Sequence, residues 1–222
     1  MITFKQFITE NDDFDLEKFK TDCDFFLSNM KGPSSLLWRG IQNPPKDYAI
    51  LPFTERTKTL DTPPHVHAFL NSYYREKIGY PIRNWLFTTG SKREADQYTD
   101  SRGGPSVVFP TGNFSWFCFK DKELKDLWLY INRLSDDINK VFTDEKEATF
   151  QLYDSLETVL DAREFWFNED LKACIESGNE IMIKCDRYYL FNPDNIAFNE
   201  YVLPYLYDEG KISPNARIYA RI

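Results

Sequence analysis

Apolar residues recur at helical spacing in five stretches of the chain. In the first stretch Phe19 and Phe26 lie two turns apart, so they share one face of a helix. The predicted helices cover residues 16–30, 62–79, 91–98, 121–138 and 152–175. Two end signals support their limits: Ser91 with Glu94 three residues later forms a capping box, and Gly178 stops the last helix.

Short apolar runs bounded by turn residues predict strands between these helices. They cover residues 36–38, 82–87, 107–110 and 114–119, with two more inside 180–191. The turn Thr111-Gly112-Asn113 predicts that the two strands beside it pair antiparallel. Residues 41–61 predict a long surface loop, and residues 195–222 carry no pattern that assigns them. The mixture predicts an α+β fold.

Composition indicates one globular domain. The chain has 222 residues, of which 17% are aromatic and 28% are charged, so it can bury a core of ordinary size. The formal net charge is −8, and the lysines and arginines form no cluster. Both features argue against a surface that neutralises a nucleic-acid backbone.

Cysteine usage and hydropathy predict a soluble, intracellular protein. The cysteines are far apart in sequence and form no CxxC pattern, so we expect them to be reduced and mostly buried; they are Cys23, Cys118, Cys174 and Cys185. No apolar run approaches the roughly 20 residues that span a bilayer. The first residues also lack the pattern of a signal peptide. We therefore expect no membrane partner.

Three phrases of the sequence carry the candidate chemistry. They are LLWRG at residues 36–40, LFTTGS at residues 86–91 and GNEIMI at residues 178–183. The first places Arg39 at the end of a predicted strand, and the second places Thr88 and Thr89 at the end of another. The third opens a late strand with Glu180.

Together these phrases resemble the ADP-ribosyltransferase superfamily of the Arg, Ser-Thr-Ser, Glu type. The resemblance covers about residues 34–190. It implies an ADP-ribosyltransferase-like fold of two packed, mainly antiparallel sheets with flanking helices, in a single domain over residues 11–222. It also implies NAD as the donor of ADP-ribose and a host protein as the acceptor.

The residue types suit that chemistry. The planar fork of an arginine holds phosphate oxygens with paired hydrogen bonds, so Arg39 would bind the pyrophosphate of NAD. Loss of nicotinamide leaves positive charge on the ribose, which a fixed carboxylate stabilises, so Glu180 is the expected catalytic residue. Thr88 and Thr89 would brace the ribose and the carboxylate.

Three further residues are expected to bind NAD. Gly40 and Ser91 belong to the quoted phrases, and Tyr98 offers a ring that could stack on nicotinamide or adenine.

Two departures from the family pattern leave alternatives open. Gly90 stands at the last Ser of the motif, and Gly178 stands where arginine-modifying members carry an acidic residue. The chain could therefore be a catalytically inactive virion or structural protein that keeps the fold. It could also be an NAD glycohydrolase, in which water replaces the acceptor.

Other motifs add no chemistry. His65 and His67 lie two residues apart on a predicted helix and face different sides, so no zinc site is expected. Arg56 and Arg83 could add phosphate contacts, but a surface position is the expectation for both. The phosphate loop GxxxxGKS and the dinucleotide fingerprint GxGxxG do not occur in the sequence, which gives no support to ATP hydrolysis or Rossmann hydride transfer.

The first ten residues, MITFKQFITE, resemble a head-targeting leader of internal proteins of contractile-tailed bacteriophages. In such leaders a phage protease cuts after an apolar residue, any residue and then Glu, which Ile8-Thr9-Glu10 fits. An ordinary amphipathic first turn is the alternative. The resemblance implies packing inside the phage head and delivery into the host cytoplasm.

Overall fold

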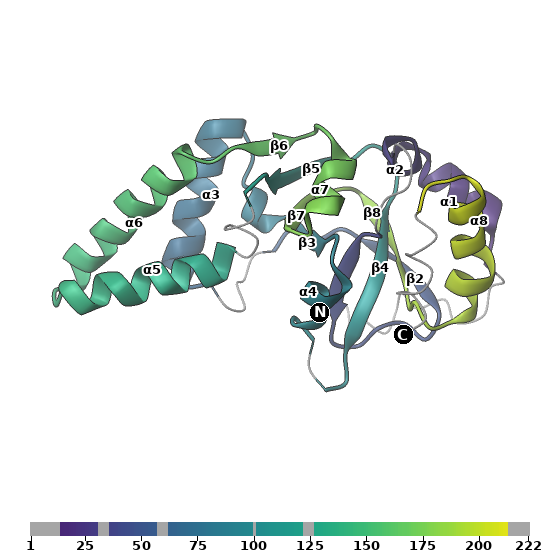
Figure 1. Ribbon diagram of the computed structural model, residues 1–222, viewed down its shortest axis with the longest axis horizontal. Coiled ribbons are helices and arrows are strands. Elements are labelled where there is room, and N and C mark those ends of the chain that lie inside the picture. The colour runs from purple at the N-terminus through teal and green to yellow at the C-terminus, as the bar shows by residue number, and fades with distance from the viewer. Residues whose placement is uncertain (1–13, 31–35, 57–61, 100, 122–126, 213–222) are drawn as a thin grey trace.

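The structure is a computed structural model that describes residues 14–30, 36–56, 62–99, 101–121 and 127–212. It is an α+β fold with an eight-stranded antiparallel sheet (Figure 1). The strands are β1 (Trp38–Ile41), β2 (Tyr48–Pro52), β3 (Leu86–Thr89), β4 (Gly104–Pro110), β5 (Ser115–Phe119), β6 (Phe165–Phe167), β7 (Glu180–Lys184) and β8 (Arg187–Phe191). The helices are α1 (Leu16–Asp22), α2 (Asp24–Asn29), α3 (Pro64–Ile78), α4 (Lys92–Asp96), α5 (Leu127–Val141), α6 (Glu145–Asp161), α7 (Leu171–Ser177) and α8 (Leu203–Asp208). A 3₁₀ turn, Ile82–Asn84, precedes β3, and a π-helix, Ala197–Val202, precedes α8.

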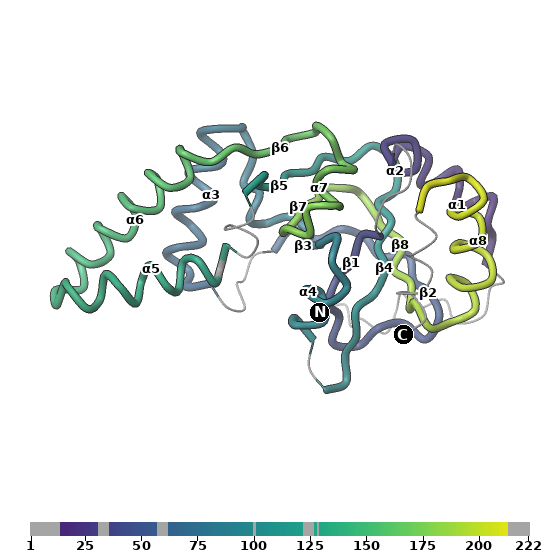
Figure 2. The backbone as a smooth tube through the Cα atoms, in the orientation of Figure 1, coloured from purple at the N-terminus to yellow at the C-terminus, as the bar shows by residue number. Residues whose placement is uncertain are grey.

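The strand order is β2-β8-β4-β1-β3-β7-β5-β6, with every pairing antiparallel. One joint in this order is narrow, because β1 and β3 share the single residue pair Trp38↔Thr89. The sheet therefore consists of two four-stranded halves. Figure 2 shows that β5 and β6 of one half run in a different direction from β4 of the other half. The strands form one hydrogen-bonded order, so the expected division into two separate sheets is not shown.

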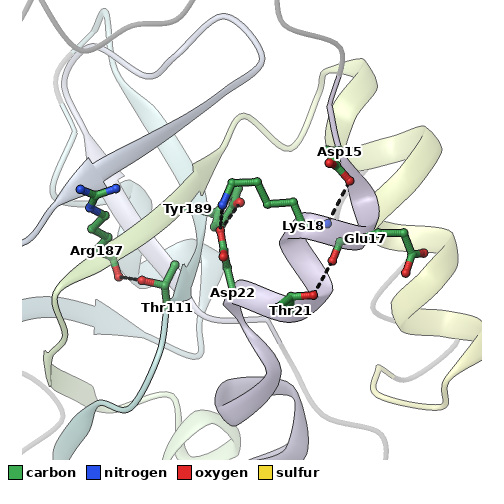
Figure 3. A network of polar contacts seen from close by, with 8 residues as sticks. All are labelled: Asp15, Glu17, Lys18, Thr21, Asp22, Thr111, Arg187 and Tyr189. Carbon is green, nitrogen blue, oxygen red and sulfur yellow. Dashed lines mark hydrogen bonds and ion pairs between the residues drawn. The ribbon is translucent and has the colours of Figure 1, made fainter.

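The half formed by β2, β8, β4 and β1 packs against α1, α2 and α8 (Figure 1). Phe19 of α1 sets its ring edge-on to the rings of Phe109, Tyr189 and Phe191, with centroids 5.0, 5.3 and 5.8 Å away. Beside this aromatic cluster the Tyr189 hydroxyl donates to Asp22 at 2.8 Å (Figure 3). The contact fixes the end of α1 on the sheet.

The half formed by β3, β7, β5 and β6 packs against α3, α5 and α6, which gather at the other end of the molecule (Figure 1). Tyr74 of α3 is buried, and the centroid of its ring lies 5.2 Å from that of the Phe117 ring. Leu152, Leu156 and Leu160 recur at helical spacing along α6, and all three are buried. The predicted apolar face of this helix is therefore its packing face.

Several predicted elements differ from the structure. β4 and β5 do not pair with each other: β4 lies between β1 and β8, whereas β5 lies between β7 and β6. The turn between them therefore carries the chain from one half of the sheet to the other. The strand β2 lies inside the region expected to be a loop, residues 41–61.

Two predicted helices are divided. The helix expected over residues 16–30 is interrupted at Cys23, whose φ of −103° and ψ of 11° depart from helical values. The one expected over residues 152–175 is split by β6 into α6 and α7. The two strands predicted inside 180–191 are confirmed as β7 and β8, and all four cysteines are free and buried as expected.

Candidate functional site

The strands that carry the three phrases are neighbours in the sheet. β3, which bears Thr88 and Thr89, lies between β1 and β7. Thr89 stands opposite Trp38 on one side and opposite Glu180 on the other. Segments that are about fifty and ninety residues apart in the sequence are thus brought side by side.

The Arg39 side chain reaches across the narrow joint between β1 and β3. Its Nη1 donates to the carbonyl oxygen of Phe87 at 2.8 Å. Its Nε is buried and has no hydrogen-bond partner among the described residues. Burial lowers the pKa of Arg39, and the only charge effect of note comes from the phenol of Tyr188. Arginine nevertheless stays charged in proteins, so this guanidinium is a cation that no described carboxylate balances.

Ser106 adds a second unpartnered polar group beside Arg39. The two residues stand opposite each other on β4 and β1, and directly opposite residues point to the same face of a sheet. Ser106 is fully buried, and its Oγ has no hydrogen-bond partner in the described part of the chain. Buried polar atoms are normally satisfied, so this pair of neighbours has unused hydrogen-bonding capacity.

The hydroxyl groups of Thr88 and Thr89 bind the backbone before and after Glu180. Thr88 Oγ1 donates to the carbonyl oxygen of Ile181 at 2.9 Å, and Thr89 Oγ1 donates to that of Gly178 at 2.9 Å. They therefore fix the strand on both sides of Glu180, rather than its carboxylate. Ser91 caps α4, because its Oγ accepts from the backbone N–H of Glu94.

Gly40 and Tyr98 lie together, for a packing reason. A Cβ added at Gly40 would lie 2.9 Å from the Cβ of Tyr98, and nearer still to the carbonyl oxygen of Ala95. The glycine lets the end of α4 approach β1 closely. The Tyr98 side chain is 45% exposed, so it does not belong to the core.

Both departures from the family pattern have a structural cause. A Cβ added at Gly90 would lie 2.5 Å from the carbonyl carbon of Ile175 and nearer still to its oxygen, so α7 leaves no room for a serine there. Gly178 caps the C-terminus of α7 with a φ of 70°. That left-handed conformation favours glycine over an acidic residue.

Glu180 forms a largely buried ion pair with Arg83. Arg83 Nη1 lies 3.2 Å from Glu180 Oε2, and the two side chains are only 4% and 12% exposed. The expectation that Arg83 lies at the surface is therefore wrong. The sequence did hold a signal, because Arg83 stands inside an apolar run, PIRNWLF, where a charged residue needs a buried partner.

No direct contact joins Arg39 to Glu180 in the described residues, but both are connected to Phe87. Arg39 binds the Phe87 carbonyl, while the guanidinium of Arg83 lies 4.4 Å from the centroid of the Phe87 ring. The guanidinium of Arg56 lies 4.6 Å from the same centroid, so Arg56 is not a plain surface residue. Three arginines thus surround one phenylalanine next to Glu180.

One of the two histidines contacts a residue next to the site, and the other is exposed. His67 Nε2 forms a 2.9 Å hydrogen bond with Asn84 Oδ1, whereas His65 is exposed on the helix surface. Burial lowers the pKa of His67, and the charges of Arg83 and Arg56 act in the same direction. Among the described residues no group of three or more histidine, cysteine or acidic side chains could hold a metal ion.

Comparison with protein-family models, with curated proteins and with solved structures finds no match to this chain. Within the described ranges no helix is both long enough and apolar enough to cross a bilayer.

Proposed function

We propose that the protein is a mono-ADP-ribosyltransferase with an ADP-ribosyltransferase-like fold, which moves ADP-ribose from NAD to a host protein. The observation that carries the proposal is the strand order β1-β3-β7. It sets the arginine phrase, the threonine pair and the glutamate phrase on three adjacent strands, with Thr89 directly opposite Glu180. A reaction that needs all three groups at one place requires such an arrangement.

The surroundings of Arg39 support an anionic ligand. A partly buried cation that no described carboxylate balances is costly, and a phosphate group would relieve that cost. The Nε of Arg39 and the Oγ of Ser106, which have no hydrogen-bond partner among the described residues, could both contribute hydrogen bonds. In this proposal Arg39 binds the pyrophosphate of NAD, and Glu180 stabilises the positive charge that develops on the ribose.

A specific observation favours a second candidate, an inactive protein that keeps the fold. The hydroxyls of Thr88 and Thr89 are already bound to the backbone at Ile181 and Gly178, and the carboxylate of Glu180 is already paired with Arg83. A chain that had lost its chemistry would show the same contacts as purely structural ones.

Labelling of a host lysate with NAD that carries a tag on its adenine separates the candidates. The transferase labels protein, the glycohydrolase releases nicotinamide without labelling, and the inactive protein does neither. Glu180→Gln should reduce labelling by at least about 100-fold while NAD affinity stays within a few-fold, because the charge acts mainly in the transition state. Full labelling by this variant would exclude Glu180 as the catalytic residue.

The alternative carboxylate is Glu176 on α7, four residues before Glu180 in the sequence. It is paired with Lys172 at 2.5 Å and is well exposed. Glu176→Gln is therefore the matched control, and we expect it to label host protein at the wild-type level. Loss of labelling in this variant alone would transfer the catalytic assignment to Glu176.

The proposed route to the host is packing inside a phage head. It rests on residues 1–10, which lie outside the described part of the structure. Mass spectrometry of protein from mature virions should find a chain that begins at Asn11, after cleavage behind Glu10. A full-length chain in those particles would argue against the leader.

A further inference from the structure

Arg83 is the residue through which α3 and the 3₁₀ turn reach Glu180. Its backbone N–H donates to Asn71 Oδ1 at 3.1 Å. Asn71 in turn donates through Nδ2 to Asn84 Oδ1 at 2.8 Å, and His67 binds the same oxygen. Because Asn71 and His67 both belong to α3, the backbone N–H of Arg83 and the side chain of Asn84 are tied to one helix.

The guanidinium of Arg83 is held as firmly as its backbone. It lies 4.4 Å from the ring centroid of Phe87, and its Nη1 also lies 3.9 Å from the Sδ of Met182. Phe87 and Met182 stand opposite each other on β3 and β7, so they form a platform under the guanidinium. Glu180 is the carboxylate that this group meets among the described residues, at 3.2 Å.

We propose that Arg83 is a positioning residue that holds the carboxylate of Glu180 in one orientation at the start of β7. The proposal rests on the catalytic role proposed for Glu180. A carboxylate that stabilises a developing charge has to be fixed before the reaction, because reorientation during the reaction would cost part of the gain. Arg83 fixes the side chain of Glu180, whereas the threonines fix the backbone around it.

A buried ion pair of this kind adds little to the stability of a fold. Two buried charges lose hydration, and well-packed apolar side chains in their place are often equally stable or more stable. The Nε of Arg83 and the hydroxyl of the neighbouring Tyr74 also have no hydrogen-bond partner in the described part of the chain. Burial of these charged and polar groups therefore costs folding stability, as expected of a group that is retained for positioning.

Arg83→Met tests the proposal in the full chain, with Arg75→Met as the control. Arg75 lies on the exposed face of α3, so the control makes the same substitution away from the site. We expect Arg83→Met to reduce kcat for transfer by at least about 10-fold with KM for NAD within about 3-fold, since a charged hydrogen bond is lost in the transition state. Arg83→Lys should recover part of kcat, because it restores the charge without the planar fork.

A merely structural role predicts that Arg83→Met leaves kcat unchanged. If Arg83 acts through Glu180, the double variant Arg83→Met with Glu180→Gln should be as inactive as Glu180→Gln alone. The double variant should also be no less stable to urea than either single variant. A kcat of Arg83→Met equal to that of Arg75→Met, in a wild type that is active, would overturn the proposal.

A second measurement separates this inference from the proposed function. The ¹³C resonance of the Glu180 carboxyl carbon is assigned by its absence in Glu180→Gln. It should shift in Arg83→Met and stay in place in Arg75→Met, whether or not the protein uses NAD. An unchanged resonance overturns the positioning role, whereas a wild type that neither labels protein nor releases nicotinamide overturns the proposed function.

Discussion

Substitutions at Gly90 test why this position of the LFTTGS phrase holds glycine rather than serine. An alanine at this position adds only the Cβ atom, which would lie 2.5 Å from the carbonyl carbon of Ile175 and 3.0 Å from its Cα. Ordinary van der Waals contact begins at 3.4 Å, so relief of the carbonyl carbon alone needs about 0.9 Å, the difference between 3.4 and 2.5 Å, and the carbonyl oxygen, which lies nearer still, needs more. The obstructing atoms are backbone, so no side-chain rotation can provide it.

The required movement would disturb a well-packed helix. α7 buries Leu171, Cys174 and Ile175 against the core, and a shift of the helix would loosen all three. Overpacking of this kind costs about 3 kcal/mol. For a chain of this size that cost lowers the melting temperature by about 6–12 °C.

Urea and thermal unfolding of Gly90→Ala beside Gly104→Ala measures the effect. An added Cβ at Gly104 meets nothing within 4 Å, so the control should stay within about 1 kcal/mol of wild type. Gly90→Ser should be at least as unstable as Gly90→Ala and should not increase transfer. If Gly90→Ala were as stable as Gly104→Ala, the close approach of α7 would be refuted, along with the explanation of the missing serine.

Three further predictions concern the same region. Arg39→Met should weaken NAD binding by at least about 10-fold in calorimetric titration and yet raise the free energy of unfolding, because it removes a half-buried charge that no described carboxylate balances; a less stable variant would contradict this account of Arg39. Thr89→Val should destabilise the chain to urea by about 1–3 kcal/mol, because Oγ1 loses its bonds to Gly178 and from Ser91. His67 favours its neutral form in the folded state, so stability should be complete above its ordinary pKa of 6.5 and fall as the pH drops below that value. Melting temperatures between about pH 5 and 8 should lose this slope in His67→Gln and keep it in a His65→Gln control.

Local pattern predicted the elements that have one apolar face. The helix expected over residues 62–79 is α3, which ends at Gly79 in the left-handed conformation, and the capping residue Ser91 is confirmed for α4. These elements follow from interactions within a few residues of sequence, which a single chain records directly.

Long-range pairing could not be predicted in the same way. The turn at residues 111–113 looked like a hairpin, but β4 is buried along most of its length and pairs on both sides. The choice of partner depends on which strands bury which faces together, and that information is spread over the whole chain. β2 was missed for a related reason, since its strand is defined by its pairing with β8.

Part of the candidate site could be predicted, but its electrostatics could not. The phrases with Arg39, Thr89 and Glu180 were found in sequence, and they lie on adjacent strands. The partner of the glutamate was missed, because Arg83 stands 97 residues away from it. That no carboxylate of the described ranges lies beside Arg39 likewise depends on the whole fold, and no local pattern reports it.

The charged groups whose burial is energetically unfavourable lie on both sides of β3. Arg39 is a half-buried cation without a described carboxylate partner, and on the other side of the same strand Arg83 and Glu180 form a buried ion pair. Neither arrangement is the most stable way to fill its space, whereas groups that bind or react are often kept at such a cost. A structural origin predicts that apolar replacements at both places raise stability without any other loss. A site for an anionic donor predicts that the same replacements raise stability and abolish NAD binding at Arg39 or transfer at Glu180, so stability and activity measured on the same variants decide between the two.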